Sequence, residues 1–141
     1  MRTFGSRARV MVLAAAVPLF AVACDGGGGE ADVEVTLSDS AVELSPTSTP
    51  SGDVTLVATN EGSMTHEFEI FTVEGDVDPA SLPVEDNVAN TDGLTLLDEV
   101  EDVTPGSEAP LTVNLDPGTY AVICNLPGHY ANGMHATLTV E

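Results

Sequence analysis

Apolar and polar residues alternate in short runs between residue 32 and the end of the chain. The run that begins at Val33 is typical, because its apolar residues at every second position are separated by Glu34 and Thr36. A period of two predicts a strand with one buried face. The strands predicted from such runs cover residues 32–37, 41–44, 54–59, 64–70, 111–115, 120–124 and 134–140.

Turn-forming residues lie between these runs, as in the Pro, Ser and Thr stretch of residues 45–52 and at Asn60-Glu61-Gly62. No long helical period appears. Several short strands separated by turn signals indicate an all-β sandwich or barrel. The chain has 141 residues, which is enough for one ordinary domain.

Residues 75–110 are acidic, interrupted by prolines and poorly periodic. We interpret them as one long loop excursion between strands, with a helical turn near residues 79–82 and a short strand or helix at residues 94–100. Four carboxylates here suggest a Ca²⁺ or partner site, although a solvated acidic loop is the favoured interpretation. They are Asp98, Glu99, Glu101 and Asp102.

Pro117 and Gly118 predict a tight bend just before Tyr120. A tyrosine in this place can hydrogen-bond back across the bend, as in the tyrosine corner of Greek-key proteins. The alternative is an ordinary turn followed by a core tyrosine. In either case Tyr120 and Cys124 share the inward face of the strand that follows the bend.

The first 23 residues differ from the rest of the chain. Three arginines precede an apolar run over residues 10–23, which is the order of regions in a secretory signal peptide. The apolar run is too short to favour a permanent transmembrane helix. We therefore predict that residues 1–23 are a signal peptide and that the protein is exported.

The end of this segment resembles a bacterial lipobox, with Ala21-Val22-Ala23 before Cys24. We therefore predict that Cys24 carries a lipid and becomes the anchor to a membrane, so that it is not a disulfide partner. Residues 24–31 contain a run of four glycines, which predicts a flexible tether. The folded domain is expected to cover residues 32–141.

Charge divides the chain at the same place. All three Lys and Arg residues occur at or before Arg9, and all 23 Asp and Glu residues follow Cys24. The predicted domain has no Lys or Arg for a salt bridge, so its folding depends on apolar burial and backbone hydrogen bonds. The charge opposes nucleic acid as a partner. It is consistent with solubility or a salty habitat, and with steering toward a basic partner protein.

One segment carries three potential metal ligands at even spacing. In Cys124-Asn125-Leu126-Pro127-Gly128-His129-Tyr130-Ala131-Asn132-Gly133-Met134, a thiol, an imidazole and a thioether follow one another at intervals of five residues. A Cys thiolate with two neutral imidazoles and a weak thioether is the ligand set of electron-transfer copper. The segment therefore needs one more histidine, and only His66 and His135 remain.

Side-chain parity separates these two histidines. His66 is expected to point into the core, whereas His135 lies on the wetter face of the last strand. His66 is therefore the predicted fourth ligand. The apolar residues that share its face in the predicted strand are Met64, Phe68 and Ile70.

Two segments of the chain resemble the small blue (type 1) copper proteins, the cupredoxins of the plastocyanin and azurin group. They are the Cys-x4-His-x4-Met segment and the upstream Asn60-Glu61-Gly62-Ser63-Met64-Thr65-His66-Glu67-Phe68. The spacing of the three ligands is most similar to that of auracyanin, sulfocyanin and rusticyanin. The resemblance covers residues 31–141 and implies a Greek-key β-sandwich of about seven or eight strands.

The resemblance also implies roles for individual residues. Many family members have Asn directly after the first ligand histidine, where this chain has Glu67. The backbone N–H of Glu67 is still expected to bond the Cys124 sulfur. Asn60, Glu67 and Pro127 are expected to support the ligands or to lie at the electron exit. The implied ligands of one copper ion, cycling between Cu(I) and Cu(II), are His66, Cys124, His129 and Met134.

The predicted function is single-electron transfer and not enzymatic catalysis. A copper enzyme such as a nitrite reductase needs a second copper site with additional histidines, and this chain has three histidines in all. A copper chaperone or scavenger with the same ligands is the alternative. An adhesive β-sandwich lipoprotein would leave the ligand spacing unexplained.

Redox proteins are the expected partners, for example a cytochrome or an oxidase or reductase complex with a basic or apolar docking face. Electrons are expected to pass through His129, because small and apolar residues of its loop surround it. The predicted location is the periplasm or the outer face of the cytoplasmic membrane, with the lipid as anchor.

Overall fold

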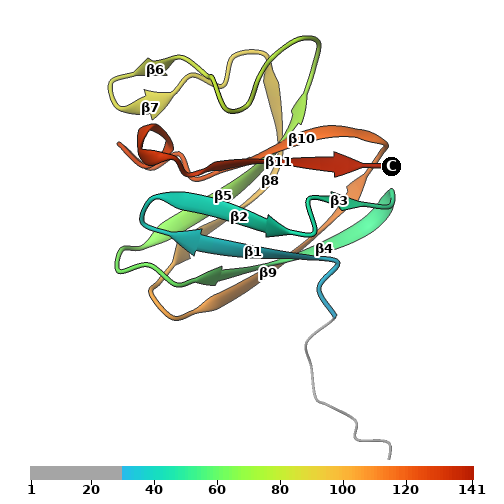
Figure 1. Ribbon diagram of the computed structural model, residues 1–141, viewed down its shortest axis with the longest axis horizontal. Coiled ribbons are helices and arrows are strands. Elements are labelled where there is room, and N and C mark those ends of the chain that lie inside the picture. The colour runs from blue at the N-terminus through green and yellow to red at the C-terminus, as the bar shows by residue number, and fades with distance from the viewer. Residues whose placement is uncertain (1–29) are drawn as a thin grey trace, which may run out of the picture.

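The computed structural model describes residues 30–141, and these form two β-sheets packed face to face (Figure 1). The first sheet contains β1 (Val33–Ser38), β2 (Ala41–Ser45), β4 (Gly52–Asn60) and β9 (Glu108–Leu115), in the order β2-β1-β4-β9. The second contains β3 (Ser48–Thr49), β5 (His66–Val73), β8 (Leu94–Val103), β10 (Gly118–Ile123) and β11 (His135–Val140), in the order β3-β11-β10-β5-β8.

The prediction of an all-β sandwich is confirmed. Within residues 30–141 the one helical segment is η1, a 3-10 turn at Tyr130–Asn132. The described residues form eleven strands, where about seven or eight were expected. The excess consists of β3 and the hairpin strands β6 (Val84–Glu85) and β7 (Val88–Ala89), which have two residues each. The architecture is that of a Greek-key sandwich.

The core lies between the sheets and is filled by alternate residues of the strands. In β4, three apolar residues at alternate positions are buried, and β5 contributes Phe68 and Ile70 to the same cluster. Cys124 and Met134 belong to this cluster as well. The segment that carries the predicted ligands therefore begins and ends in the core, where packing fixes the positions of its ends.

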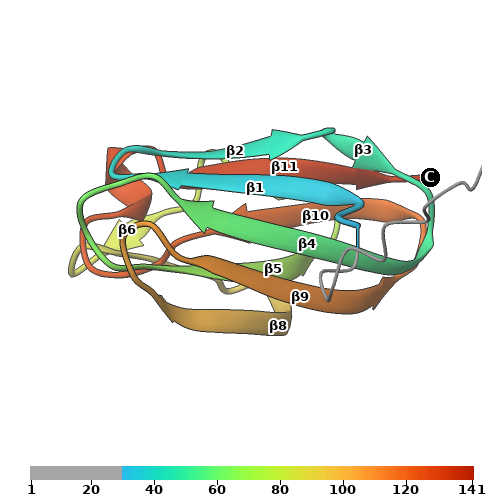
Figure 2. The same cartoon turned by 90° about the horizontal axis from the view of Figure 1, so that it is seen from below.

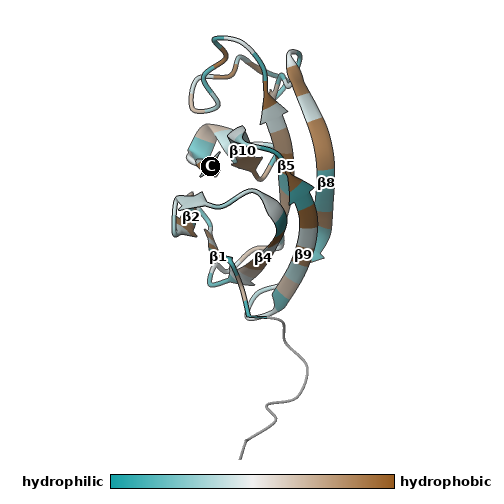
Figure 3. Ribbon diagram, turned by 90° about the vertical axis from the view of Figure 1, so that its right-hand side faces the viewer, coloured by the Kyte–Doolittle hydropathy of each residue, from teal (hydrophilic) through white to brown (hydrophobic). Residues whose placement is uncertain are grey.

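The acidic excursion is shorter than predicted. Residues 94–103 form β8, an edge strand that pairs with β5, so the loop lies between residues 74 and 93 and contains the β6–β7 hairpin. The stretch near residues 79–82 is a turn and not a helix. The short strand or helix expected at residues 94–100 is therefore a strand, and it extends to Val103. Figure 3 shows that its first half is mostly hydrophobic and its second half mostly hydrophilic, so apolar and polar residues do not alternate along it.

The excursion covers a second, smaller hydrophobic cluster on the outer side of the five-stranded sheet. Leu82 and Ala89 of the excursion pack there against Phe71, Ile123 and Tyr130. Tyr130 lies in η1, within the predicted ligand segment. The excursion therefore packs against the outside of that segment.

The bend before Tyr120 forms a tyrosine corner, as the sequence indicates. The Tyr120 hydroxyl donates a hydrogen bond of 2.7 Å to the carbonyl oxygen of Asp116. This bond closes the connection between β9 and β10, at the end of β10 that lies away from Cys124.

The two ends of the sandwich carry different parts of the chain. Figures 1 and 2 show η1 and the turn between β1 and β2 at one end, whereas β1 begins and β11 ends at the other. The predicted signal peptide (residues 1–23), the lipid site Cys24 and residues 24–29 of the predicted tether lie outside the described residues. Among those described, no helix is long and apolar enough to cross a membrane.

Candidate metal centre

Two strands that are neighbours in the sheet supply the ends of the site. His66 is the first residue of β5, and Cys124 directly follows β10. The strands pair in antiparallel register with Ile123 opposite Glu69, which brings the start of β5 beside the end of β10. The chain from Cys124 then turns back through His129 to β11.

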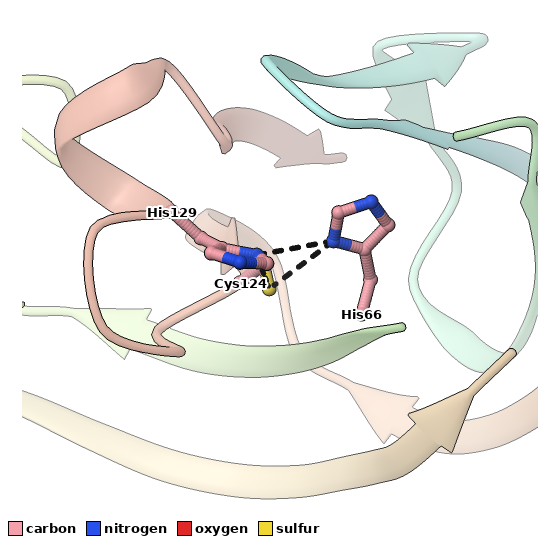
Figure 4. Close-up of side chains that lie close together, drawn as sticks. All are labelled: His66, Cys124 and His129. Carbon is pink, nitrogen blue, oxygen red and sulfur yellow. Dashed lines mark hydrogen bonds between the residues drawn. The ribbon is translucent and has the colours of Figure 1, made fainter. Parts of the chain in front are cut away.

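The predicted ligand atoms converge. The Nδ1 atom of His66 lies 3.1 Å from Nδ1 of His129 and 4.0 Å from Sγ of Cys124. Nδ1 of His129 lies 3.4 Å from the same sulfur. Figure 4 shows both rings directing nitrogen toward the sulfur. One ligand atom from each residue therefore lies within 4.8 Å of the others.

The three side chains differ in exposure. His66 and Cys124 are fully buried, whereas His129 is only partly buried and is the one that reaches toward solvent. Burial raises the pKa of the Cys124 thiol, and the hydrogen bond from the Glu67 N–H acts in the opposite direction. Burial, followed by the proximity of His66, lowers the pKa of His129, which favours the neutral imidazole that a metal requires.

Met134 closes the segment from inside the core. Its side chain is fully buried, its N–H donates to the His129 carbonyl at 3.2 Å, and its carbonyl accepts from the Cys124 N–H at 3.1 Å. These backbone bonds hold Met134 next to the other predicted ligands. The role of its thioether as the fourth ligand of the metal stays a prediction.

The comparisons with known proteins decide the family. The sequence model of the cupredoxin-like domain family matches residues 10–140, which is nearly the whole chain. The chain belongs to the cupredoxin-like domain family. No curated protein sequence matches this cupredoxin.

Solved structures of auracyanins have the same fold. Auracyanin from Roseiflexus castenholzii is 22% identical with a TM-score of 0.53, and the match covers 81% of this chain and 99% of that one. Auracyanin B is 26% identical with a TM-score of 0.54, covering 77% and 87% of the two chains. Auracyanin A from Chloroflexus aurantiacus is 20% identical with a TM-score of 0.50, covering 77% and 99%.

The donor set of this cupredoxin fits one copper ion. Two imidazole nitrogens and one thiol sulfur converge, and soft sulfur with imidazole is the combination that copper sites use. The prediction of copper as the cofactor is confirmed on these grounds. Cys124 forms no disulfide within the part of the chain that the structure describes, so its sulfur is available as a ligand.

His135 does not join the cluster. It stays on the other side of β11, where its ring packs against the ring of Tyr130 with centroids 4.9 Å apart. One detail of the parity argument is wrong, because Met64 lies before β5 begins and is 41% exposed. Met64 therefore belongs to the loop that leads to His66 and not to the core face.

The three predicted supporting residues lie close to the ligands. Asn60 is buried and donates hydrogen bonds to the carbonyl oxygens of Met64 and Val103 at 2.8 and 2.7 Å, which fixes the loop before His66. The Glu67 N–H lies 3.5 Å from the Cys124 sulfur, as expected despite the absence of Asn at this position. Pro127 is exposed beside His129.

Sequence reasoning missed the contacts between the excursion and the ligand segment. The Asn125 side chain accepts from the Ala89 N–H at 2.8 Å and donates to the Ala89 carbonyl at 3.2 Å. The Tyr130 hydroxyl donates to the Pro79 carbonyl at 2.6 Å and accepts from the Leu82 N–H at 2.9 Å. These bonds link the excursion to the ligand segment.

Replacing Tyr130 by Phe tests this link. The change leaves the N–H of Leu82 and the carbonyl of Pro79 buried without a partner, so the free energy of unfolding is expected to fall by about 1–3 kcal/mol. We also expect copper to dissociate faster, because His129 directly precedes Tyr130. Urea unfolding and copper transfer to a chelator measure the two effects.

Tyr120→Phe is the matched control, because it also removes a hydroxyl hydrogen bond but far from the ligands. It is expected to lower stability by about 0.5–1.5 kcal/mol and to leave the rate of copper release unchanged. Equal release rates in Tyr130→Phe and wild type would contradict the proposed support of the ligand segment by the excursion.

Glu69 of β5 has an unusual carboxyl, which lies on the outer face of the five-stranded sheet. Burial first, then the charges of Glu67 and Glu99, raise its pKa from 4.5 to about 7. Glu99 lies directly opposite it on β8, and one carboxyl oxygen of Glu69 is buried without a hydrogen-bond partner in the described residues. The folded chain therefore disfavours the charged form of Glu69.

This pKa predicts how stability changes with pH. Because the pKa is higher in the folded state, ionisation of Glu69 lowers the free energy of unfolding. This loss of stability is absent below pH 4.5, grows as the pH rises and is complete above pH 7. Glu69→Gln is expected to raise the free energy of unfolding of the apoprotein at pH 8 by about 1–2 kcal/mol, allowing for screening at a half-buried site. Unfolding in urea at pH 4 and pH 8 measures it.

The exposed Glu43 supplies the control for Glu69→Gln. Glu43→Gln removes the same charge without a buried carboxyl, so its effect is expected to stay within about 0.5 kcal/mol at both pH values. A Glu69→Gln variant with the same stability difference at pH 4 and pH 8 would show that Glu69 titrates normally.

Proposed function

We propose that this cupredoxin is a mononuclear type 1 copper protein that carries single electrons between redox partners at a membrane. The observation that carries the proposal is the convergence of His66, Cys124 and His129 within 4.8 Å. A copper ion bound there supplies a one-electron couple, Cu(II) and Cu(I). The proposed ligand set includes Met134 as the fourth member.

Rigid placement of the donors supports a carrier role. His66 and Cys124 are fully buried at the ends of paired strands, and backbone hydrogen bonds join Met134 to Cys124 and His129. Donor groups that are held by a packed sandwich move little when the charge at the site changes. A chaperone that must release its ion favours the opposite, a loose and accessible site.

His129 is the proposed electron exit. It is the least buried of the three clustered residues, and exposed Pro127 and Ala131 lie near it in the same segment. Tyr130 of the same loop does not add to this surface, because it is buried with its hydroxyl bonded to Pro79. Small apolar surfaces suit brief encounters between redox proteins.

The partner is proposed to be a cytochrome or an oxidase or reductase complex with a basic or apolar docking face. Residues 30–141 contain no Lys or Arg, so the whole domain attracts basic surfaces. The location that we propose is the periplasm or the outer face of the cytoplasmic membrane, with Cys24 lipidated. The start of β1 at the end opposite η1 supports this, because an anchored domain then presents His129 away from the lipid (Figure 1).

Two rates distinguish a carrier from a copper chaperone or scavenger. For the carrier we expect fast electron self-exchange between the Cu(I) and Cu(II) proteins and slow release of copper to a chelator. Slow self-exchange with rapid release would favour the chaperone. The self-exchange rate is measured by NMR line broadening in mixtures of the two oxidation states.

Reduction by cytochromes of opposite charge tests the partner. A basic cytochrome is expected to react at a rate that falls steeply as salt increases, because the attraction is screened. An acidic cytochrome of similar potential serves as the control and is expected to react slowly at low salt. Equal rates for both cytochromes at low salt would argue against steering by charge.

A further inference from the structure

The turn between β1 and β2 carries a carboxylate that contacts the segment before His66. The carboxylate of Asp39 accepts hydrogen bonds from the Ser63 N–H at 2.9 Å, the Ser63 hydroxyl at 2.6 Å and the Met64 N–H at 3.1 Å. Its Oδ1 atom also lies 3.1 Å from Nε2 of His66. Among residues 30–141, this is the one contact between a carboxylate and a basic side chain.

The packing around this contact leaves no spare room. A Cβ atom at Gly62 would overlap Oδ1 of Asp39 and would lie 2.9 Å from Nε2 of His66. The same turn also backs the other ligand segment, because a Cβ at Gly133 would lie 2.6 Å from the carbonyl oxygen of Ser40. The β1–β2 turn is therefore packed against both segments that carry ligands.

The two nitrogens of His66 have separate contacts. Nδ1 faces Cys124 and His129, whereas Nε2 faces Asp39. A neutral imidazole carries one proton, and a carboxylate can only accept, so the proton belongs on Nε2 and the lone pair on Nδ1 is free to bind a metal. A carboxylate on the distal nitrogen also makes the ring a stronger electron donor.

We propose that Asp39 is a positioning residue for copper, which fixes the tautomer and orientation of His66 and stabilises Cu(II) relative to Cu(I). This inference rests on the copper site of the proposed function but not on any particular partner. The negative charge lies one imidazole ring from the ligand atom, and the fully buried ring of His66 separates it from the site, although the Asp39 side chain itself is 37% exposed.

The first experiment compares reduction potentials of the copper-loaded variants Asp39→Asn and Glu43→Gln. Asparagine keeps the size and one acceptor oxygen of Asp39 but removes the charge. We expect Asp39→Asn to shift the equilibrium at least tenfold toward Cu(I), which is a rise of about 59 mV for one electron. Glu43→Gln removes a charge from the same hairpin without touching a ligand, and it is expected to shift the equilibrium less than threefold.

The second experiment needs no variant and therefore survives a failure of Asp39→Asn to fold. In the diamagnetic Cu(I) protein, the Nε2 proton of His66 is expected as a slowly exchanging NMR signal, because the His66 ring is buried and its Nε2 contacts the Asp39 carboxylate. In Asp39→Asn that signal is expected to exchange faster or to move upfield. A wild-type His66 without a proton on Nε2 would overturn the proposal.

The outcomes separate Asp39 from the copper site itself. If wild type shows the thiolate-to-copper absorption and Asp39→Asn has the potential of Glu43→Gln, the role of Asp39 is refuted and the copper site stands. If copper-treated wild type lacks that absorption, the proposed function is refuted, and the inference about Asp39 falls with it.

Discussion

Replacing Cys124 by Ser is expected to abolish the visible absorption of the oxidised, copper-loaded protein. The absorption of a type 1 site arises from charge transfer between the thiolate and copper, and a serine hydroxyl stays protonated at neutral pH and offers a hard oxygen. Copper affinity is expected to fall by more than the 10–100-fold typical of changes to groups behind the ligands. An optical spectrum, an EPR spectrum and a copper titration measure these effects.

The chain supplies its own control, because it has only two cysteines. Cys24→Ser is expected to keep the full absorption and the EPR signal, since Cys24 is predicted to hold a lipid and not a metal. Its expected defect is loss of membrane attachment in cells. A Cys124→Ser variant that retains a band near that of wild type would rule out Cys124 as a copper ligand.

The positions of the predicted ligands follow from local rules. An alternating strand fixes which side of the sheet each residue faces, so His66 and Cys124 could be placed inward from neighbouring residues alone. The even spacing of Cys124, His129 and Met134 confines them to one connection between two strands. The structure brings His66, Cys124 and His129 together, and Met134 is buried in the same core.

The contacts that support the ligands depend on tertiary structure and have no local signal. Asp39 lies in a turn 27 positions before His66, and nothing in its own segment indicates that the turn meets a ligand. Asn125 and Tyr130 bond to an excursion that has no periodicity of its own. β8 escaped detection as a full strand because an edge strand can leave both faces partly exposed, which removes the alternation.

The acidic composition also limits how the fold is stabilised. With no Lys or Arg among residues 30–141, no carboxylate there can pair with a Lys or Arg of the same stretch. Hydrogen bonds from Ser63 and Met64 instead lower the pKa of Asp39 to about 2. Glu69 is the opposite case, because burial first, and then the charges of Glu67 and Glu99, raise its pKa, so this carboxyl resists ionisation whereas Asp39 stays charged.

Replacing Phe68 by Ala is expected to cause the largest loss of stability among the changes that leave all ligands in place. Phe68 is fully buried in the core and lies two residues after His66 on β5. Removing a buried phenyl ring costs about 3–5 kcal/mol, a large part of the 5–15 kcal/mol that stabilises an ordinary domain. Urea unfolding of the apoprotein and of the copper-loaded protein measures this loss.

The comparison of the two forms decides whether Phe68 also positions His66. A residue that only supports the fold lowers both free energies of unfolding equally, whereas one that also holds a ligand weakens copper binding and lowers the copper-loaded value more. We expect the larger loss in the copper-loaded form. Phe68→Leu, which keeps most of the apolar volume, is expected to cost about 1 kcal/mol in both forms. Equal losses for Phe68→Ala in the two forms would mean that His66 is held without help from the core side of β5, by Asp39 and the 60–65 loop.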